Sequence, residues 1–424
     1  MGTFHSARWI SDGTGQTRAQ RASGTYKYFL PTKLEHLNIK LNSDVSGDVS
    51  RAELALQKVD TSSKTLKSTE GIARLLLRAE AISSSYIEGL SIGAKRLLQE
   101  ELRLKYNLNC KIDATAASVV GNINAMDRAI QQGLNDDIIT TETITNIHKT
   151  LCKNTKIEQY GGIIRAEQNW IGGSSFNPLN AIYISPAPEH LDELLIDLCN
   201  FCNSKNISPV VKASIIHAQF EAIHPFADGN GRTGRALIHL ILRNDNFIKN
   251  LVPPISLIMA TNNEEYINGL TEFRSIDTNK EENNLDNLNN YISFFAWCCT
   301  KACEESQNFE DRAIKNETAW RKKLGSVRKN SALDKILSEF TGMPIFTINT
   351  AMQTINMSFD AVSDAVNRCL DAKIIKQSNN FKRNKVFEVP ESLKQINWFE
   401  RKLASPSGDT SIAQPKRPVP YIIK

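Results

Sequence analysis

The sequence predicts a mainly α-helical protein that carries a small β-hairpin and has a C-terminal winged helix-turn-helix domain. Apolar residues recur at spacings of three and four through much of the first 300 residues, as in helices with one buried face. Residues 161–188 interrupt this pattern with two short β-prone runs around a turn rich in Gly, Ser, Asn and Pro. Residues 331–390 read as three helices followed by two β-like pieces, an order typical of winged helices.

The composition is that of a globular protein with more than one domain. At 424 residues the chain exceeds one ordinary core, so we expect two or three domains. A net charge of +5 over this length does not by itself indicate nucleic-acid binding. The longest apolar runs, 255–260 and 294–299, are too short to span a membrane, and the polar N-terminus lacks a signal-peptide core. We therefore expect a cytoplasmic protein with no membrane partner.

Eight cysteines raise the alternatives of a disulfide framework or a zinc site. Cys199 and Cys202 form a lone C-x-x-C inside a helical run, and no second pair is placed to complete four ligands. The expectation is reduced thiols that pack as small apolar residues.

The N-terminal part predicts a loose arm followed by helices. Residues 1–25 are polar and rich in Gly, Ser and Thr, so we expect a flexible arm. From residue 70 the apolar positions share one helical face as far as Gly89, and a second helix is predicted over 91–104. Further helices are predicted at 114–132, 141–154, 188–204, 209–222 and 232–243.

The hairpin and the C-terminal elements complete the pattern. The runs 169–173 and 181–184 predict a hairpin on the helical body. After a basic run at 321–330, helices are predicted at 332–340, 349–355 and 359–372, and β-like pieces at 374–377 and 386–389. The two pieces flank a basic wing with Lys382, Arg383 and Lys385.

These patterns predict a domain organisation. It comprises a flexible arm (1–25), an N-terminal helical domain (26–113), a core with trailing helices (114–300), a basic helical linker (301–330), the winged helix-turn-helix (331–395) and a disordered tail (396–424).

The residues that carry chemistry lie in the stretch 223–235, Ile-His-Pro-Phe-Ala-Asp-Gly-Asn-Gly-Arg-Thr-Gly-Arg. Pro225 forces His224 out of the right-handed helical region, so the preceding helix must end there. Gly229 and Gly231 have no Cβ, which lets the backbone come close to a ligand. The next helix starts at once and directs free N–H groups forward, so this stretch predicts an anion site.

The charged residues of the stretch narrow the chemistry. Arg232 and Arg235 lie on neighbouring turns and can both face the loop. Asp228 offers a hard oxygen ligand suited to Mg²⁺, and His224 can take a proton near neutral pH. Together they predict phosphoryl or nucleotidyl transfer.

The stretch resembles the signature of the Fic (filamentation induced by cyclic AMP) family, His-x-Phe-x-Asp/Glu-Gly-Asn-Gly-Arg-x-x-Arg, with every fixed position filled by residues 224–235. The segment from Gly162 through Arg165 to Pro188 is similar to the family's flap hairpin, and residues 30–110 look like its N-terminal companion domain. The resemblance implies a Fic-type helical bundle and a nucleotidyltransferase that moves AMP from ATP to Ser, Thr or Tyr hydroxyls of proteins and of itself.

The resemblance also implies roles for individual residues. His224 would be the catalytic base and Asp228 would hold Mg²⁺. The nucleotide-binding residues would be Gly229, Asn230, Gly231, Arg232, Thr233, Gly234, Arg235 and, lining the adenine pocket, Tyr266. ATP and Mg²⁺ are the implied cofactors.

A second element of the family lies upstream. Ser84-Ser-Tyr-Ile-Glu88-Gly89 matches the inhibitory motif Ser/Thr-x-x-x-Glu-Gly/Asn. In such proteins the glutamate pairs with the second arginine, here Arg235, and blocks productive placement of the γ-phosphate. The resemblance therefore implies that Glu88 restrains the enzyme.

The other histidines have simpler interpretations. His217 and His239 are expected to be packed or surface residues of helices, and His148 and His190 to be exposed.

Alternatives remain open at this point. The same site could remove AMP from a modified protein with Glu88 positioning water, or a regulatory DNA-binding protein could use the core to sense ATP. The winged helix could bind DNA or dock a protein, since its wing is basic while its presumed recognition helix carries Asp360, Asp364 and Arg368. A homodimer is compatible with the sequence. The target protein is not identified by the sequence.

Overall fold

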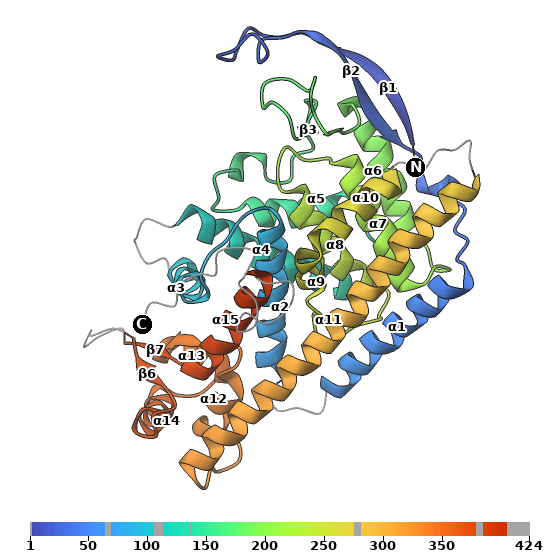
Figure 1. The fold of residues 1–424 in the computed structure, drawn as a ribbon. Coiled ribbons are helices and arrows are strands. Elements are labelled where there is room, and N and C mark those ends of the chain that lie inside the picture. The colour runs from blue at the N-terminus through green and yellow to red at the C-terminus, as the bar shows by residue number, and fades with distance from the viewer. Residues whose placement is uncertain are drawn as a thin grey trace. The chain divides into compact units, whose positions relative to one another are not determined.

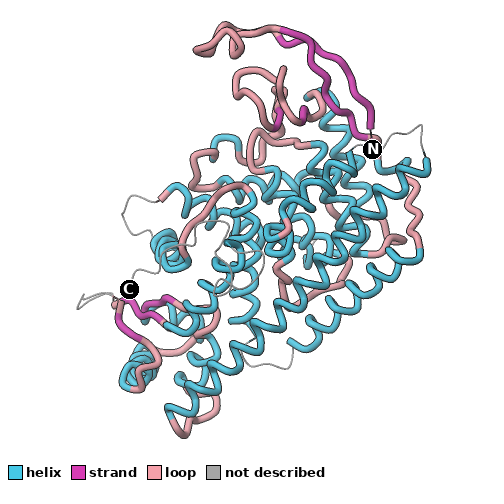
Figure 2. Tube along the Cα trace, in the orientation of Figure 1, coloured by secondary structure: helices cyan, strands magenta, loops and turns pink. Residues whose placement is uncertain are grey.

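The structure, a computed structural model, describes residues 2–63, 69–105, 113–135, 138–274, 281–378 and 385–404. It is mainly helical with three small sheets, as the sequence predicts (Figures 1 and 2). The chain divides into two compact units. The first unit contains residues 1–53, 124–247 and 263–297, and the second unit contains residues 54–123, 248–262 and 298–424.

The described residues contain helices close to every position predicted between residues 70 and 243 and between 332 and 372, together with others that were not predicted individually. They are α1 (Ser43–Ser63), α2 (Thr69–Ile87), α3 (Ala94–Lys105), α4 (Ala114–Asn135), α5 (Thr141–Cys152), α6 (Leu191–Cys202), α7 (Pro209–Ile223), α8 (Asn230–Asn244), α9 (Ile255–Thr261), α10 (Asn263–Arg274), α11 (Glu281–Leu324), α12 (Ala332–Glu339), α13 (Ile348–Ile355), α14 (Phe359–Asp371) and α15 (Pro390–Ala404). Short 3-10 turns lie at Leu34–His36, Glu158–Tyr160 and Pro188–His190.

The core of the first unit is built around α7. Ser208 caps its N-terminus by accepting from the Val211 N–H, and Pro209 occupies the first turn, where no backbone donor is needed. Almost every side chain of α7 is buried, because α6, α8 and α10 pack around it. A helix that is buried on nearly all sides is stable only inside such a bundle.

Residues 2–31 form a β-hairpin where the sequence predicted a loose arm. Strand β1 (Gly2–Trp9) pairs antiparallel with β2 (Gly24–Pro31) over its whole length. Tyr28 and Phe29 of β2 are buried, while most of β1 is exposed. Strand β1 was not predicted because it is mostly exposed and lacks an apolar alternation.

The predicted flap hairpin is present and short. Strand β3 (Trp170–Ile171) pairs with β4 (Tyr183–Ile184), and the Ile182 N–H also donates to the Ile171 carbonyl. Ile182 itself is 87% exposed.

In the second unit, α2 packs against the turn after α12. Gly71 and Gly342 bring the two backbones together so closely that a Cβ on Gly342 would lie 2.6 Å from the Gly71 Cα. Arg74 forms an ion pair with Glu339, and Arg78 donates to the Gly342 carbonyl and to both carboxylate oxygens of Glu101.

The C-terminal elements follow the order α12, β5 (Ile345–Thr347), α13, α14, β6 (Lys376–Gln377) and β7 (Val386–Glu388), with a three-stranded sheet ordered β5-β7-β6. Strand β5 was not predicted, because its three residues are too few to show a period. Lys382 and Arg383 of the predicted wing lie outside the described residues.

Two predicted segments differ in the structure. Residues 301–324, predicted as part of a basic helical linker, are helical, but they continue helix α11 and bury Phe309 and Trp320 in the core. Residues 396–404 form the end of α15, where a disordered tail was expected, because Phe399 stacks on Phe309 with ring centroids 3.8 Å apart. Residues 405–424 lie outside the described part.

Other expectations concern thiols and membranes. Seven cysteines are described, and all are buried and free, as predicted; Cys110 lies outside the described residues. Among the described helices, none combines the length and apolar character needed to cross a membrane.

The contact between α2 and the C-terminal elements gives a prediction of stability. Gly342→Ala should lower the free energy of unfolding by about 1–3 kcal/mol, because its Cβ would collide with the backbone of Gly71 and α2 would have to shift. Denaturant titration measures this change. Gly93→Ala is the matched control, because its Cβ meets no atom within 4 Å. Equal stability of the two variants would contradict the contact.

Candidate functional site

The candidate site of the first unit centres on the loop between α7 and α8. His224 ends α7 with φ 50° and ψ 59°, the left-handed region, and its N–H donates to the Phe220 carbonyl at 2.9 Å. Gly229 has φ 80° and precedes α8, whose first turn carries no side-chain cap. A side chain at Gly229 would lie 2.9 Å from Leu151, so only glycine fits there. The helix N-terminus is therefore left open toward the loop.

Asn230 fixes the inside of the loop. Its side-chain oxygen accepts from the Phe226 N–H at 2.9 Å, and its amide nitrogen donates to the Phe226 carbonyl at 2.8 Å. Phe226 is fully buried and stacks on His148, with ring centroids 3.7 Å apart. The apolar ring thus anchors the loop while the polar tip at Asp228 stays outside.

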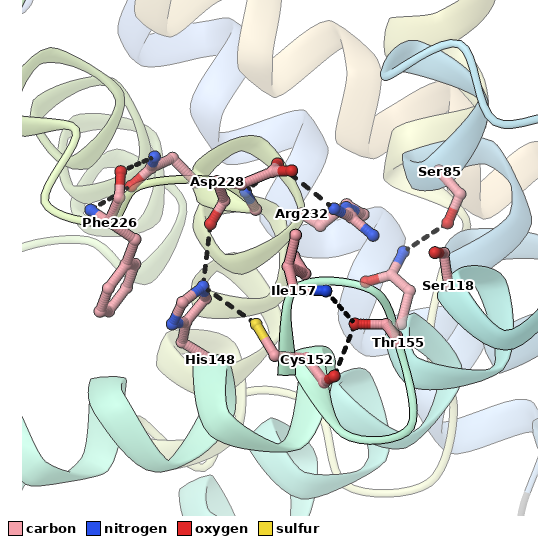
Figure 3. Close-up of polar contacts among 12 residues, drawn as sticks. Ser85, Ser118, His148, Cys152, Thr155, Ile157, Phe226, Asp228 and Arg232 are labelled. Atoms are coloured by element: carbon pink, nitrogen blue, oxygen red, sulfur yellow. Dashed lines mark hydrogen bonds and ion pairs between the residues drawn. The ribbon is translucent and has the colours of Figure 1, made fainter. Parts of the chain in front are cut away.

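His148 is buried, contrary to the prediction that it is exposed. Its Nδ1 accepts from the Gly162 N–H at 3.0 Å, so the ring proton lies on Nε2, which donates to the Asp228 carbonyl at 2.9 Å (Figure 3). Burial lowers the pKa of His148 to about 4, and the ring is neutral at physiological pH. A helix residue that looked exposed in the sequence therefore positions the backbone of Asp228.

Arg165 anchors His224 from the side of the flap. Its backbone N–H donates to the Pro225 carbonyl at 3.0 Å, and its Nε donates to the His224 carbonyl at 2.9 Å. The same guanidinium donates to the Ser185 hydroxyl and to the Pro186 carbonyl. Burial lowers the pKa of Arg165 to about 10, which leaves it charged at neutral pH.

Asn169, at the start of the flap, contacts the ring of His224. Its amide nitrogen lies 2.8 Å from His224 Nδ1 and 3.0 Å from the Phe226 carbonyl, while its amide oxygen accepts from the Ser185 hydroxyl. These partners fix the orientation of the amide, so the group facing Nδ1 is a donor. Asn230 places a second amide nitrogen 3.1 Å from Nδ1. Nδ1 is therefore an acceptor, and neutral His224 carries its proton on Nε2.

The two arginines of α8 have different surroundings. Arg232 lies 3.7 Å from the Asp228 carboxylate, whose side chain is 59% exposed (Figure 3). Arg235 is buried and donates to the Tyr266 hydroxyl at 3.4 Å. Both guanidinium groups are buried; Arg232 lies beside the carboxylate of the loop, and Arg235 contacts Tyr266 of α10.

Tyr266 belongs to a buried polar cluster with Arg235 and His217. The Tyr266 hydroxyl lies 2.9 Å from His217 Nε2. Burial, with a smaller effect of Arg235, lowers the pKa of His217 to about 3, so the ring is neutral at physiological pH and shares one hydrogen bond with the tyrosine hydroxyl. His217 and His239 are both buried, so they are packed histidines.

Thr233 and Gly234 lie within the helix packing. Both are buried, and a Cβ on Gly234 would lie 3.0 Å from the Phe220 ring of α7. Gly234 thus lets α7 and α8 approach closely.

The upstream motif is described within the second unit. Ser84 is buried on α2, Glu88 is exposed just after the helix ends, and Gly89 has φ 76°. The Gly89 N–H donates to the Tyr86 carbonyl and the Leu90 N–H to the Ser85 carbonyl, which closes the end of the helix. Asn122 supports this turn by donating to the Ala81 carbonyl and the Ser85 hydroxyl.

Among the described residues, no group of three or more His, Cys, Asp or Glu side chains lies close enough together to hold a metal ion. A metal at Asp228 would need further ligands from water or from a bound molecule.

Sequence comparisons identify relatives of both regions. Residues 138–242 match the family model described as Fic/DOC family, and residues 47–131 match the model described as Fic/DOC family N-terminal. A protein adenylyltransferase of Caenorhabditis elegans is 32% identical over 133 residues, which are 31% of this chain and 23% of that protein. A probable protein adenylyltransferase of Aquifex aeolicus is 30% identical over 138 residues, 32% of this chain and 38% of that protein. The chain therefore aligns with less than half the length of these curated relatives.

A solved structure shares the fold. A Fic family protein from Desulfovibrio desulfuricans G20 superposes with a TM-score of 0.50 at 17% identity, covering 82% of this chain and 97% of that one.

Proposed function

This chain belongs to the Fic/DOC family, and from that premise we propose that it transfers AMP from ATP to hydroxyl side chains of proteins, itself included. The observation that carries the proposal is the loop between α7 and α8. It combines a histidine, an exposed carboxylate and a buried arginine side chain with the open N-terminus of a 15-residue helix. This set provides a proton acceptor and positive potential for phosphates in one loop.

The reaction requires His224 to accept a proton from the target hydroxyl. The hydroxyl oxygen forms a bond to the α-phosphorus of ATP, the bond to the bridging oxygen breaks, and pyrophosphate leaves. His224 Nδ1 accepts amide N–H groups, so Nε2 is protonated in the resting site. His224 can therefore accept the target's proton at Nε2 only after the ring proton has moved to Nδ1. The amide of Asn169 would then turn its oxygen toward Nδ1.

The α8 N-terminus and its arginines suit the phosphates. Backbone N–H groups of Asn230 and Gly231 would bind phosphate oxygens, as would that of Gly229 once the Asp228 carboxylate releases it, and Arg232 would neutralise the phosphate charge. Arg235 and Tyr266 already contact one another, which holds Arg235 in place beneath the loop. Thr233 and Gly234 support this arrangement through packing of α8.

Asp228 fits Mg²⁺, because its carboxylate is exposed at the loop tip beside the expected phosphates. The cation would supply positive charge that stabilises the leaving pyrophosphate. The chain's own contribution is to fix the carboxylate: His148 donates to the Asp228 carbonyl, and the Gly229 N–H donates to the carboxylate.

The same family premise supports a restraint by Glu88. A carboxylate and a γ-phosphate are both anions, so they compete for one arginine, here Arg235. Glu88 follows the closed end of α2, where the turn fixes its backbone.

We further infer a winged helix over residues 332–388, based on the element order and the β5-β7-β6 sheet. Exposed Asp360, Asp364 and Asp371 outnumber Arg368 on α14. Because these carboxylates would repel DNA phosphates, the charge of α14 favours a protein partner.

His224→Ala tests the proposed function. With labelled ATP, Mg²⁺ and cell lysate, transfer should fall at least 10²-fold while ATP binding stays close to wild type, because only the proton acceptor is lost. His36→Ala removes an exposed histidine and serves as the control. Transfer at the wild-type rate in His224→Ala would exclude His224 as the base.

Glu88→Gly tests the restraint. Transfer to self and to target should rise about tenfold for each 1.4 kcal/mol by which the substitution lowers the preference for the restrained state. The free energy of unfolding should change little. Glu142→Gln, which removes an exposed charge from α5, is the control. Unchanged transfer in a folded, ATP-binding Glu88→Gly variant would contradict the restraint. Loss of AMP removal together with a gain of transfer would instead indicate a hydrolase that uses Glu88.

A further inference from the structure

The N-terminal hairpin lies outside both segments that match the family models, yet it packs on the flap. Residues 47–131 and 138–242 carry the family matches, whereas β1 and β2 occupy residues 2–31. In Figure 1 the hairpin runs beside the flap, with its connecting loop next to the flap's own loop. A segment outside the matched regions that packs on the flap beside His224 can alter what approaches the site.

Three kinds of contact join the hairpin to the flap. Trp9 and Trp170 pack edge to face with ring centroids 5.4 Å apart. Tyr28 forms an apolar cluster with Ile184 and Ala187. The Asn177 side chain donates to two carbonyls of the hairpin's loop, those of Ala19 and Gln20. Packing and directional hydrogen bonds thus combine, so the hairpin and flap form one continuous surface.

The exposed side of the hairpin is basic. Arg8, Arg18, Arg21 and Lys27 are exposed, and none forms an ion pair with any residue that the structure describes. The only acidic residue between positions 2 and 31 is Asp12, which accepts from the Thr14 N–H and hydroxyl. Four unpaired cations beside the flap create a positive potential where a target would approach.

The strand geometry provides a place for an extended segment. Within the described residues β1 pairs only with β2, so one edge of β1 has unpaired backbone groups. Apolar Ile10 follows this edge and is 77% exposed, comparable to Ile182 on the flap. Backbone pairing and apolar contacts suit an extended chain, and the cations select its charge.

We propose that the β1–β2 hairpin and the flap together form the docking surface for target proteins, and that it selects targets with an acidic segment near the modified hydroxyl. This proposal rests on the proposed function, because the flap is the element beside His224. Packing explains the inward side chains of the hairpin. It does not require four cations on the outward side, and recognition of an acidic partner accounts for them.

The test measures binding to the full chain without ATP, so that its result does not depend on transfer. The probe is a fluorescent random copolymer of glutamate and tyrosine, compared with a copolymer of lysine and tyrosine. The wild type should prefer the acidic copolymer, with an affinity that falls as salt rises. Arg18→Glu with Arg21→Glu should weaken binding by about tenfold or more, since two attractions become repulsions in a loop that tolerates substitution.

The control is Arg128→Glu with Lys205→Glu, which makes the same charge change at exposed sites of α4 and the turn after α6. It should bind the acidic copolymer like the wild type. Equal losses in the two double variants, no loss in either, or a wild-type preference for the lysine copolymer would overturn the proposal. The proposal would also be overturned if a single-stranded oligonucleotide bound more tightly than the acidic copolymer and if its binding were lost only in the Arg18/Arg21 variant.

A transfer assay separates this proposal from the proposed function. The Arg18/Arg21 variant should retain automodification and ATP binding, while kcat/KM for the acidic copolymer falls. If the wild type binds the copolymer as expected but no variant or substrate shows transfer, the docking surface stands and the proposed function fails.

Discussion

A histidine held in the left-handed backbone region ahead of a proline is the constraint on which the site depends. This conformation costs a residue with a Cβ about 1–3 kcal/mol, so surrounding contacts must offset it. Arg165 donates to the His224 carbonyl, and Phe220 accepts the His224 N–H. The strained turn places the ring at the end of α7 and starts α8 six residues later, which leaves the helix N-terminus open in front of it. Without this turn the ring and the anion site would not share one loop.

The flap is the source of much of this support. Arg165 and Asn169 both bind the His224 turn, and both also contact Ser185 on the far side of the hairpin. A protein segment that docks on the flap therefore approaches residues that set the orientation and the protonation of His224. Under the proposed docking on the flap, binding of the target and the protonation of His224 would be linked through the side chains of Arg165 and Asn169.

The sequence predicted most of the helices and the loop because each signal there is local. Pro225 after His224, the glycines at 229 and 231, and the 3.6-residue period of α2 and α7 are readable without neighbours. The role of His148 could not be read in this way, since it depends on Gly162 and Asp228, which are distant in sequence. Asn169 gave no signal for the same reason. Strand β1 was missed because its partner β2, and not its own pattern, makes it a strand.

The flap, through Asn169, holds His224 in the tautomer protonated at Nε2. The most direct measurement is the ¹⁵N NMR spectrum of the His224 ring in the full chain without nucleotide, assigned with a His224→Gln variant. The account predicts an unprotonated Nδ1 and a protonated Nε2 in the wild type, and a proton drawn to Nδ1 in Asn169→Asp, whose carboxylate only accepts. A proton on Nδ1 in the wild type, unchanged in Asn169→Asp, would contradict it.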